Sequence, residues 1–254
     1  MKISIISIAF NNEKDIRGTI DSVIMQDYKS IEHIIVDGVS TDNTLDIVRS
    51  YGDKIDKVIS EPDKGIYDAI NKGIKNATGD VVGLIHAGDR LYDSTTISDI
   101  VEHFTKNDID ASYGHSVITN SKDEAVRINK SPEFKRSHFK RGWMPSHQSI
   151  YIRRELFDKL GYYRLDLGGS GDYEFVLRYF YFNDLKVKLL DRFIIKFSLG
   201  GLSTSNYHKI LSTQKTHVKC WELNGEKPPF YMIPLKLGRK IPQFAKAFVK
   251  RLGG

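Results

Sequence analysis

The sequence has one cysteine, Cys220, and no apolar run that approaches the ~20 residues of a transmembrane helix. A single thiol excludes an internal disulfide framework and is typical of a reducing compartment. The first ten residues, MKISIISIAF, are apolar, but they are too short to cross a bilayer and lack a small-residue cleavage site. We therefore expect a buried first strand, and Cys220 as an inert packing residue.

Two nucleotide-binding signatures are also absent. No G-x-G-x-x-G follows the first apolar run, and no G-x-x-x-x-G-K occurs anywhere. Their absence removes support for a dinucleotide-binding fold and for a P-loop. The sequence shows no internal repeat, no low-complexity tract and no linker that would mark a second domain.

Acidic residues are missing from the last part of the chain. From Lys227 to Gly254 there are seven basic residues and no acid, so the other 31 basic residues face 32 acidic ones. The formal charge of +6 therefore belongs largely to this tail. A nucleic-acid binder would more often carry a basic face on the fold itself, so we expect no nucleic-acid partner.

What the chain does have is an alternation of apolar strands and amphipathic helices over residues 1–90. Apolar strands separated by helices predict a parallel, doubly wound sheet that is covered on both faces. The clearest helix is Gly65–Ala77, where one buried stripe is expected at three- and four-residue spacing. That stripe consists of Ile66, Ala69, Ile70, Gly73, Ile74 and Ala77. The predicted strands are Lys2–Phe10, Ile31–Val36, Ile55–Ser60 and Val81–Ile85, and the other two helices are Glu13–Gln26 and Asp42–Tyr51.

Polar and acidic residues follow each of these strands, at the edge of the sheet where such folds bind ligands. The fourth strand is the most informative, because it ends in His86-Ala87-Gly88-Asp89. Two tiny residues and one carboxylate leave room for a bulky anion that is held through a metal ion. The strand ends therefore predict a nucleotide site at this edge.

The second half of the chain is less regular. Ala111–Thr119 and Ala125–Asn129 are predicted to pair as a hairpin, and Val187–Leu190 and Phe193–Ser198 to form two strands. Asp172 lies near the start of a helix in GGSGDYEFVLRYFYF. On spacing alone this aspartate fits a general base and a helix N-cap equally well.

Three motifs, found together and in this order, resemble one family. They are VDGVSTDNT (36–44), DKGIYDAINKGI…GD…AGD (63–89) and HQS…RR…G…GDYEFVLR (147–178). The sequence is similar to the family 2 glycosyltransferases, inverting enzymes of GT-A fold, and particularly to the bacterial branch that builds O-antigen and exopolysaccharide repeat units.

This resemblance covers roughly residues 1–200. It implies an α/β fold, with a single GT-A (Rossmann-like nucleotide-diphospho-sugar transferase) domain around a central, mostly parallel sheet at 1–204. A nucleotide-binding half would span about 1–90 and an acceptor-binding half about 91–204. Residues 205–254 would form a basic, helical C-terminal extension, with a helix at Ser205–Leu223.

The same resemblance implies a UDP-sugar donor. Asp37 would accept a hydrogen bond from the uracil edge, and the alternative is that it only caps a turn. The backbone around Ser7–Phe10, which includes Ala9, would form the rest of the base pocket, with Asn11 at the same strand end.

Two residues of the third helix, Asp68 and Asn71, would face the donor. The alternative for Asp68 is an i,i+4 surface pair with Lys72.

Asp89 matches the last carboxylate of the family's metal motif, so the resemblance implies that it holds Mn²⁺ or Mg²⁺ against the donor phosphates. His86 and Gly88 occupy positions where other members often carry aspartate, so the metal would be held by Asp89, waters and phosphates. Gly88 would let the diphosphate approach. His86 would either bind ribose or pack at the strand end.

Asp172 matches the family's catalytic base, and Glu174 is the second choice for that role. An inverting transfer is a direct displacement, so one carboxylate must take the proton of the acceptor hydroxyl. His147 would lie near the diphosphate or the acceptor, and a satisfied core histidine is the alternative.

The resemblance also implies an undecaprenyl-diphosphate-linked saccharide as acceptor. A basic segment before His147 would contact its phosphates or form a solvated loop; it contains Lys135, Arg136, Lys140 and Arg141. Near the C-terminus, apolar residues recur at helical spacing among basic ones, at Ile241, Phe244, Ala245, Phe248 and Leu252. Such a helix suits an anionic membrane surface, and packing on protein is the alternative. We thus expect a cytoplasmic protein at the inner face of the membrane.

The predicted function is therefore a metal-dependent inverting glycosyltransferase of bacterial surface polysaccharide assembly. A sugar-nucleotide pyrophosphorylase would need a glycine-rich loop with Arg and Lys after the first strand, and AFNNEKDIRG does not supply one. A non-catalytic nucleotide- or lipid-binding protein would be favoured by the loss of Asp89 or Asp172, and both are present. The sugar, the linkage and the oligomeric state stay open.

Overall fold

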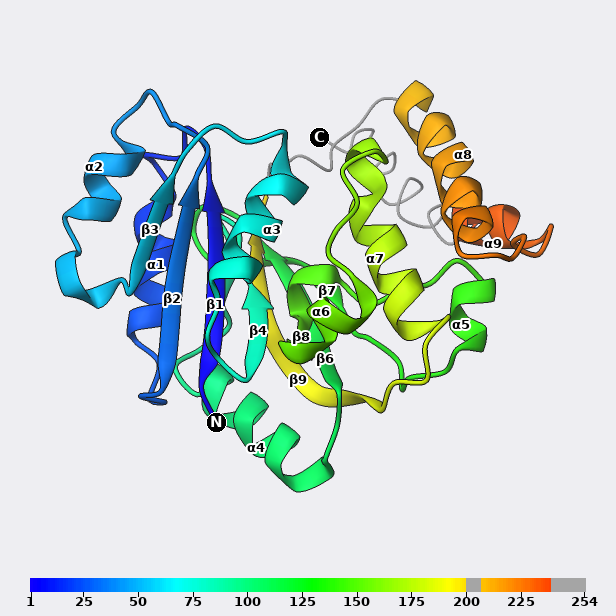
Figure 1. Ribbon diagram of the computed structural model, residues 1–254, viewed down its shortest axis with the longest axis horizontal. Helices are drawn as coiled ribbons and strands as arrows, with labels where there is room; N and C mark the ends of the chain where they lie inside the picture. The colour runs from blue at the N-terminus through cyan, green and yellow to red at the C-terminus, as the bar shows by residue number, and fades with distance from the viewer. Residues whose placement is uncertain (200–206, 239–254) are drawn as a thin grey trace, which may run out of the picture.

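The computed structural model describes residues 1–199 and 207–238. It shows one mixed sheet with helices on both faces (Figure 1). The strands are β1 (Ile3–Ala9), β2 (Ile31–Asp37), β3 (Lys57–Ser60), β4 (Val81–Leu84), β5 (Arg90–Leu91), β6 (Ala111–Thr119), β7 (Ala125–Asn129), β8 (Ile150–Arg153) and β9 (Val187–Ser198). The α-helices are α1 (Ile16–Ile24), α2 (Thr44–Arg49), α3 (Ile66–Asn76), α4 (Thr96–Asn107), α5 (Ser137–Lys140), α6 (Glu155–Leu160), α7 (Gly171–Phe180), α8 (Tyr207–Leu223) and α9 (Met232–Gly238). Three 3₁₀ turns, η1 (Gly52–Lys54), η2 (His147–Ser149) and η3 (Gly168–Ser170), complete the elements.

The predicted parallel, doubly wound arrangement is confirmed for the first four strands. They lie in the order β3-β2-β1-β4, and every pair among them is parallel. The sheet then continues through β8, β6, β9 and β5, where only the β6–β9 pair is parallel. The whole sheet is therefore mixed, and its parallel part is the half that carries the predicted nucleotide site.

Alternation along β1 explains how its two faces are filled. Ile6 and Ile8 belong to one buried cluster with α3, whereas Ile3 and Ile5 belong to another with α4. Successive side chains of a strand point to opposite faces, so the run of isoleucines serves both layers. Helix α3 can approach closely because a Cβ on Gly73 would lie 2.3 Å from the Ile6 side chain.

The predicted stripe of α3 is buried except at its first position. Ala69, Ile70 and Ile74 are at most 3% exposed, but Ile66 is 37% exposed. Ile66 is the first residue of the helix, where the preceding Gly65 turns the chain at φ 108°. The stripe is therefore buried only from its second member, Ala69, onward.

In the second half, the predicted hairpin of β6 and β7 is confirmed. The two strands predicted at Val187–Leu190 and Phe193–Ser198 are one long strand, β9. The prediction places a break at Asp191 and Arg192, but β9 passes through them where its register with β6 is irregular. A bulge of this kind accommodates extra residues without ending a strand.

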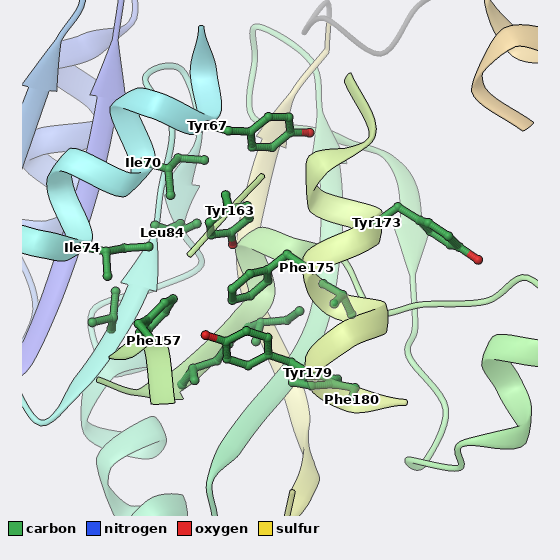
Figure 2. Close-up of a cluster of buried hydrophobic side chains, with 14 of the residues drawn as sticks. Tyr67, Ile70, Ile74, Leu84, Phe157, Tyr163, Tyr173, Phe175, Tyr179 and Phe180 are labelled. Carbon is green, nitrogen blue, oxygen red and sulfur yellow. The ribbon is translucent and has the colours of Figure 1, made fainter. Parts of the chain in front are cut away.

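Aromatic rings fill the space between α3 and α7 (Figure 2). Tyr163 stacks on Phe175 with ring centroids 4.0 Å apart, and on Tyr67 at 5.7 Å. Figure 2 shows Tyr173 projecting from the other side of α7. There its hydroxyl accepts a hydrogen bond from the indole N–H of Trp221 on α8 at 2.9 Å.

Helices α8 and α9 belong to the same core. Cys220, Trp221 and Met232 are fully buried in the cluster that contains the aromatic rings of α7, so Cys220 is a packing residue as predicted. The amphipathic helix predicted around 241–252 lies outside the described residues. Within 1–199 and 207–238, no helix is both long and apolar enough to span a bilayer.

Candidate active site

Asp37, the last residue of β2, is fully buried, and its carboxylate is held by its own turn. Oδ2 accepts hydrogen bonds from the backbone N–H of Ser40 at 3.1 Å and from Oγ of Ser60 at 2.8 Å. Asp37 thus caps the turn after β2, which was the alternative to uracil recognition. A carboxylate has about four acceptor positions, so this capping is compatible with one further bond to a ligand.

The loops that follow β1 and β2 are tied together. Ala9 pairs in register with Asp37, which sets the two strand ends side by side. Asn11 lies in the left-handed region at φ 51°, and its Oδ1 accepts a hydrogen bond from the backbone N–H of Thr41 at 2.8 Å. Val39 also has a positive φ, 63°, a conformation that β-branched residues rarely adopt. Such strain persists only where surrounding contacts hold it.

Gly38 lies where the loops that follow β1 and β3 come close to its backbone. A Cβ at this position would lie 2.6 Å from Oδ2 of Asp63 and 3.3 Å from the ring of Phe10. Phe10 is 58% exposed, although it follows a buried strand. An exposed ring beside a strand-end carboxylate offers a flat apolar face and a hydrogen-bond acceptor, which suits a nucleobase.

The two predicted donor residues of α3 are engaged inside the protein. Oδ2 of Asp68 accepts a hydrogen bond from the backbone N–H of Lys64 at 3.0 Å and lies 3.7 Å from Nζ of Lys72. Asn71 is 8% exposed and binds the backbone of Tyr163 through both ends of its amide, at 2.8 and 2.9 Å. Asn71 therefore joins α3 to the segment before α7, and any contact with a donor would compete with these bonds.

Asp89 lies just beyond β4 and is anchored from two sides. Nε2 of Gln148 donates to its Oδ2 at 2.9 Å, and the backbone N–H of Ser198, at the end of β9, donates to its Oδ1 at 3.2 Å. Burial raises the pKa of Asp89 to about 6, although these two hydrogen bonds act in the opposite direction. A desolvated carboxylate of this kind gains most from a bound cation.

The ligating side chains around Asp89 show whether a divalent metal fits this site. Within 1–199 and 207–238, no group of three or more His, Cys, Asp and Glu side chains is placed to hold a metal ion. Mg²⁺ commonly uses one or two carboxylates together with substrate phosphates and waters. Asp89 alone therefore fits a metal that arrives with a diphosphate, and does not fit a metal bound by the protein alone.

Gly88 shapes the approach to Asp89. It has a φ of 98°, and a Cβ there would come no closer than 3.7 Å to its nearest neighbour, on Asp15. Its backbone N–H donates to Oγ1 of Thr19 at 2.9 Å, and its carbonyl accepts a hydrogen bond from the Ser198 hydroxyl. Glycine is needed at this position for its backbone conformation and not for lack of room, because a Cβ there would make only an ordinary contact with Asp15.

His86 follows β4 and His147 begins η2, and their ring centroids lie 5.3 Å apart. Both ring nitrogens of His86 and Nε2 of His147 are buried without a hydrogen-bond partner among the described residues. Burial lowers the pKa of both histidines; the charge of His147 lowers that of His86 further, and the charge of Asp172 opposes the shift of His147. Both imidazoles are therefore neutral near pH 7. The interpretation of His147 as a satisfied core histidine is not what the structure shows.

Asp172 is the second residue of α7. The hydroxyl of Tyr67 on α3 donates to its Oδ1 at 3.2 Å. This approach depends on Gly171, since a Cβ there would lie 2.7 Å from the Tyr67 ring. Gly171 thus serves the packing of α3 against α7.

Glu174, the second choice for the base, has a structural role. It is 1% exposed, and its carboxylate pairs with Nε of Arg178 at 2.9 Å and accepts a hydrogen bond from Asn224. Arg178 in turn donates to the carbonyls of Leu160, Gly161 and Tyr162. A buried, paired carboxylate of this kind cannot reach an acceptor hydroxyl, so the expectation for Glu174 is wrong.

Two residues of the site, Gln148 and Tyr67, were missed as site residues by sequence reasoning. Gln148 is 7% exposed and joins the backbone N–H of His86 to the carboxylate of Asp89. Tyr67 was passed over within the DKGIYDAINKGI motif because it does not fall on the aliphatic stripe of α3. The only sequence signal for either residue is its place inside a motif.

Comparisons with known proteins identify the family and the fold of this chain. Residues 4–161 match the sequence model of glycosyl transferase family 2. A PGL/p-HBAD biosynthesis glycosyltransferase of Mycobacterium bovis is 29% identical over 207 residues, which cover 80% of this chain and 79% of that protein.

Two solved structures show a similar fold. Staphylococcus aureus TarS 1–349 in complex with UDP-GlcNAc has a TM-score of 0.73 and 20% identity, covering 95% of this chain and 73% of that one. The mannosyltransferase PcManGT from Pyrobaculum calidifontis in complex with GDP-Man and Mn²⁺ has a TM-score of 0.62 and 16% identity, covering 94% and 68%.

Proposed function

The chain belongs to glycosyl transferase family 2, and on this premise we propose that it is a metal-dependent, inverting transferase that uses a UDP-sugar donor. The observation that carries the proposal is the Tyr67–Asp172 hydrogen bond, 3.2 Å long. It holds the carboxylate of Asp172, at the start of α7, against α3. Helix α3 belongs to the same half of the protein as the strand ends of β1, β2 and β4. The proposed general base, Asp172, therefore lies where α7 meets α3.

The proposed donor site uses the carboxyl ends of the parallel strands. Asp37 accepts a hydrogen bond from the uracil ring, which Phe10 flanks. The fold matches that of TarS, which was solved with UDP-GlcNAc, and this supports a UDP-sugar at the same edge. Asp89 would hold a Mn²⁺ or Mg²⁺ ion that arrives with the diphosphate, and the complex of PcManGT with GDP-Man and Mn²⁺ supports a divalent ion in this fold.

The proposed reaction is one displacement at the anomeric carbon. Asp172 takes the proton of the acceptor hydroxyl as that oxygen forms a bond to the anomeric carbon, and the bond to the phosphate oxygen breaks from the opposite side. A bound metal would stabilise the negative charge that develops on the departing UDP. Gln148 and the backbone of Ser198 fix the orientation of Asp89, and Tyr67 fixes that of Asp172.

We also propose a lipid-linked saccharide, of the undecaprenyl-diphosphate kind, as the acceptor in bacterial surface polysaccharide assembly. A relative named for PGL/p-HBAD biosynthesis supports a role in surface glycolipids. The protein would then work at the cytoplasmic face of the membrane.

An exposed apolar tip supports this location. Phe230 is 92% exposed and Leu235 is 44% exposed, both in or beside α9. The basic end of α5 adjoins this helix, since a Cβ on Gly142 would lie 2.7 Å from Lys236. Exposed Lys140 and Arg141 therefore stand near an exposed apolar tip, a combination that suits an anionic membrane surface.

Calorimetric titration of UDP and GDP, each with and without Mn²⁺, tests the donor site. We expect binding of UDP in preference to GDP, dependent on Mn²⁺, and lost in Asp89→Ala. Asp80→Ala is the matched control, because Asp80 is an aspartate at the amino end of β4 that binds the backbone of Lys2. If neither nucleotide binds, or if Asp80→Ala has the same effect as Asp89→Ala, the proposed donor site is wrong.

A further inference from the structure

Three ring nitrogens in the site lack a partner that their burial demands. They are Nδ1 and Nε2 of His86 and Nε2 of His147, and no described residue hydrogen-bonds to them. A buried polar group that is left without a hydrogen-bond partner destabilises the folded protein. His115 shows the contrast, since its Nε2 binds Asp191 at 2.8 Å and its Nδ1 accepts a hydrogen bond from the backbone N–H of Ser131 at 3.2 Å. His33 leaves Nδ1 unpartnered but binds Ser7 through Nε2 at 3.0 Å, whereas His86 has no partner at either nitrogen. The two unpartnered rings are therefore built to meet something that is not part of the protein.

The pair lies between the two carboxylates of the proposed mechanism. On one side, the backbone N–H of His86 donates to Oε1 of Gln148 at 2.9 Å, and the same side chain holds Asp89. On the other side, His147 is close enough to Asp172 for that charge to act on its ring. The two imidazoles therefore lie between Asp89, where the diphosphate is proposed to bind, and Asp172, the proposed base.

The surroundings decide the class of group that fits. Burial keeps both rings neutral, and the nearest charge that acts on them is the negative charge of Asp172 on His147, so an anion has no positive charge to bind. A metal ion is also disfavoured, because the described residues place no three ligating side chains together. A neutral imidazole offers one donor and one acceptor, and a hydroxyl group is the neutral partner that uses both.

We propose that His86 and His147 bind the hydroxyl groups of the donor's sugar ring and take part in selecting the sugar. This inference rests on the proposed function, because the sugar has to lie between the diphosphate at Asp89 and the base at Asp172. It assigns the histidines to the sugar and not to the phosphates, the ribose or the metal.

Nitrogen NMR of the histidine side chains in the wild-type protein tests the assignment directly. UDP is added first, with Mg²⁺ to avoid paramagnetic broadening, and then UDP-GlcNAc, UDP-glucose or UDP-galactose, whichever binds most tightly. We expect UDP to leave the His86 and His147 signals in place and the UDP-sugar to shift them within the range of neutral imidazole. Equal shifts with UDP alone, a change to the imidazolium range, or no shift with any UDP-sugar would overturn the proposal.

Calorimetry on variants gives an independent measurement. His86→Asn and His147→Asn should each lower the affinity for the UDP-sugar by about tenfold, which corresponds to 1.4 kcal/mol, and leave the affinity for UDP unchanged. His103→Asn, on α4 and away from the site, is the matched control. If the wild-type protein binds UDP but the variants lose UDP and UDP-sugar affinity equally, the histidines contact the nucleotide and the sugar assignment fails alone. If the wild type does not bind UDP, the proposed function fails with it.

Discussion

The Tyr67 hydroxyl and the Asp172 carboxylate meet across 105 positions of sequence, with an O···O distance of 3.2 Å. One residue belongs to the helix that follows β3, and the other starts the helix that follows η3. Burial and the neighbouring Asp172 charge raise the pKa of Tyr67, so its hydroxyl remains protonated at any working pH. The tyrosine thus acts as a permanent donor that orients the proposed base.

Tyr67→Phe should therefore lower kcat by about ten- to a hundredfold, because a hydrogen bond to a charged group is worth about 1.5–3 kcal/mol. The donor KM should stay unchanged, since the ring stack with Tyr163 at 5.7 Å does not need the hydroxyl. UDP release from the UDP-sugar measures both constants. Tyr51→Phe, which removes a surface hydroxyl bonded to Asp21, is the control. An equal rise in KM, or an unchanged kcat, would argue against a positioning role.

Asp172→Asn and Glu174→Gln separate catalysis from packing. Loss of the base should reduce kcat by about 10²–10⁴-fold while UDP still binds. Glu174→Gln should instead lower the free energy of unfolding by about 3 kcal/mol, because it leaves the Arg178 guanidinium without its buried partner. Its folded fraction should keep kcat within a few fold. Urea denaturation and initial rates on both variants check this, and the reverse pattern would exchange the two roles.

Metal-dependent UDP binding should depend on pH through Asp89, whose pKa burial raises to about 6. Affinity should be constant from pH 7 to 8 and fall by up to about tenfold per unit below pH 6, where the carboxyl takes up a proton. The stability of the ligand-free protein should depend on pH in the opposite direction. Because the folded pKa lies above the ordinary value of 3.8, stability declines as pH rises from about 4 through 6.

Calorimetry from pH 5 to 8 with Mn²⁺ measures this profile. Asp89→Asn should bind UDP no better than the metal-free wild type at any pH, so the pH dependence disappears with the metal-dependent binding. An affinity that stays flat down to pH 5 in the wild type would show that Asp89 is not the group that titrates.

Glu32 should govern stability in acid. It lies at the amino end of β2 and accepts hydrogen bonds from the backbone N–H of Thr78 at 2.8 Å and from Nζ of Lys2 at 3.0 Å. Burial alone would raise the pKa of Glu32, but the hydrogen bonds from Ser4, Thr78 and Lys2 lower it to about 2. The stability that the ionised form contributes is therefore present above pH 4.5 and lost as the pH falls toward 2.

Glu32→Gln should cost about 2 kcal/mol of unfolding free energy at pH 7 and much less at pH 3. Urea denaturation at both values measures the difference. Glu102→Gln removes an exposed glutamate paired with Lys106, and it should change stability by less than about 1 kcal/mol at either pH. A penalty for Glu32→Gln that does not shrink in acid would contradict the assignment.

Phe230→Ser should weaken binding to anionic vesicles. Burial of a phenylalanine side chain is worth about 1.5–3 kcal/mol, so the partition coefficient should fall roughly tenfold. Sedimentation with vesicles of phosphatidylcholine, with and without phosphatidylglycerol, measures it. Val126→Ser on β7, where the side chain is 53% exposed, is the matched control. Unchanged binding of Phe230→Ser would remove this tip from the membrane contact.

Patterns with a short period determined the parallel half of the fold. Apolar runs and the three- and four-residue spacing of α3 are local properties, and they predicted β1, β2, β3 and β4 as parallel strands with a polar edge. Ala9, Asp37 and Asp89 were found at that edge because the end of a strand is itself a local feature. Asp172 was singled out from the glycines that precede its helix together with the resemblance to family 2, and its role as the base stays a prediction.

Only the tertiary structure decided which polar side chains face the site. Glu174 and Asp172 are two positions apart on one helix, yet one is buried against Arg178 and the other meets Tyr67. Gln148 reaches Asp89 across 59 positions. Such choices depend on which distant surfaces pack together, and the spacing of residues along the chain does not encode them. Composition and period determined the sheet and its binding edge, and long-range packing assigned each carboxylate and imidazole its partner.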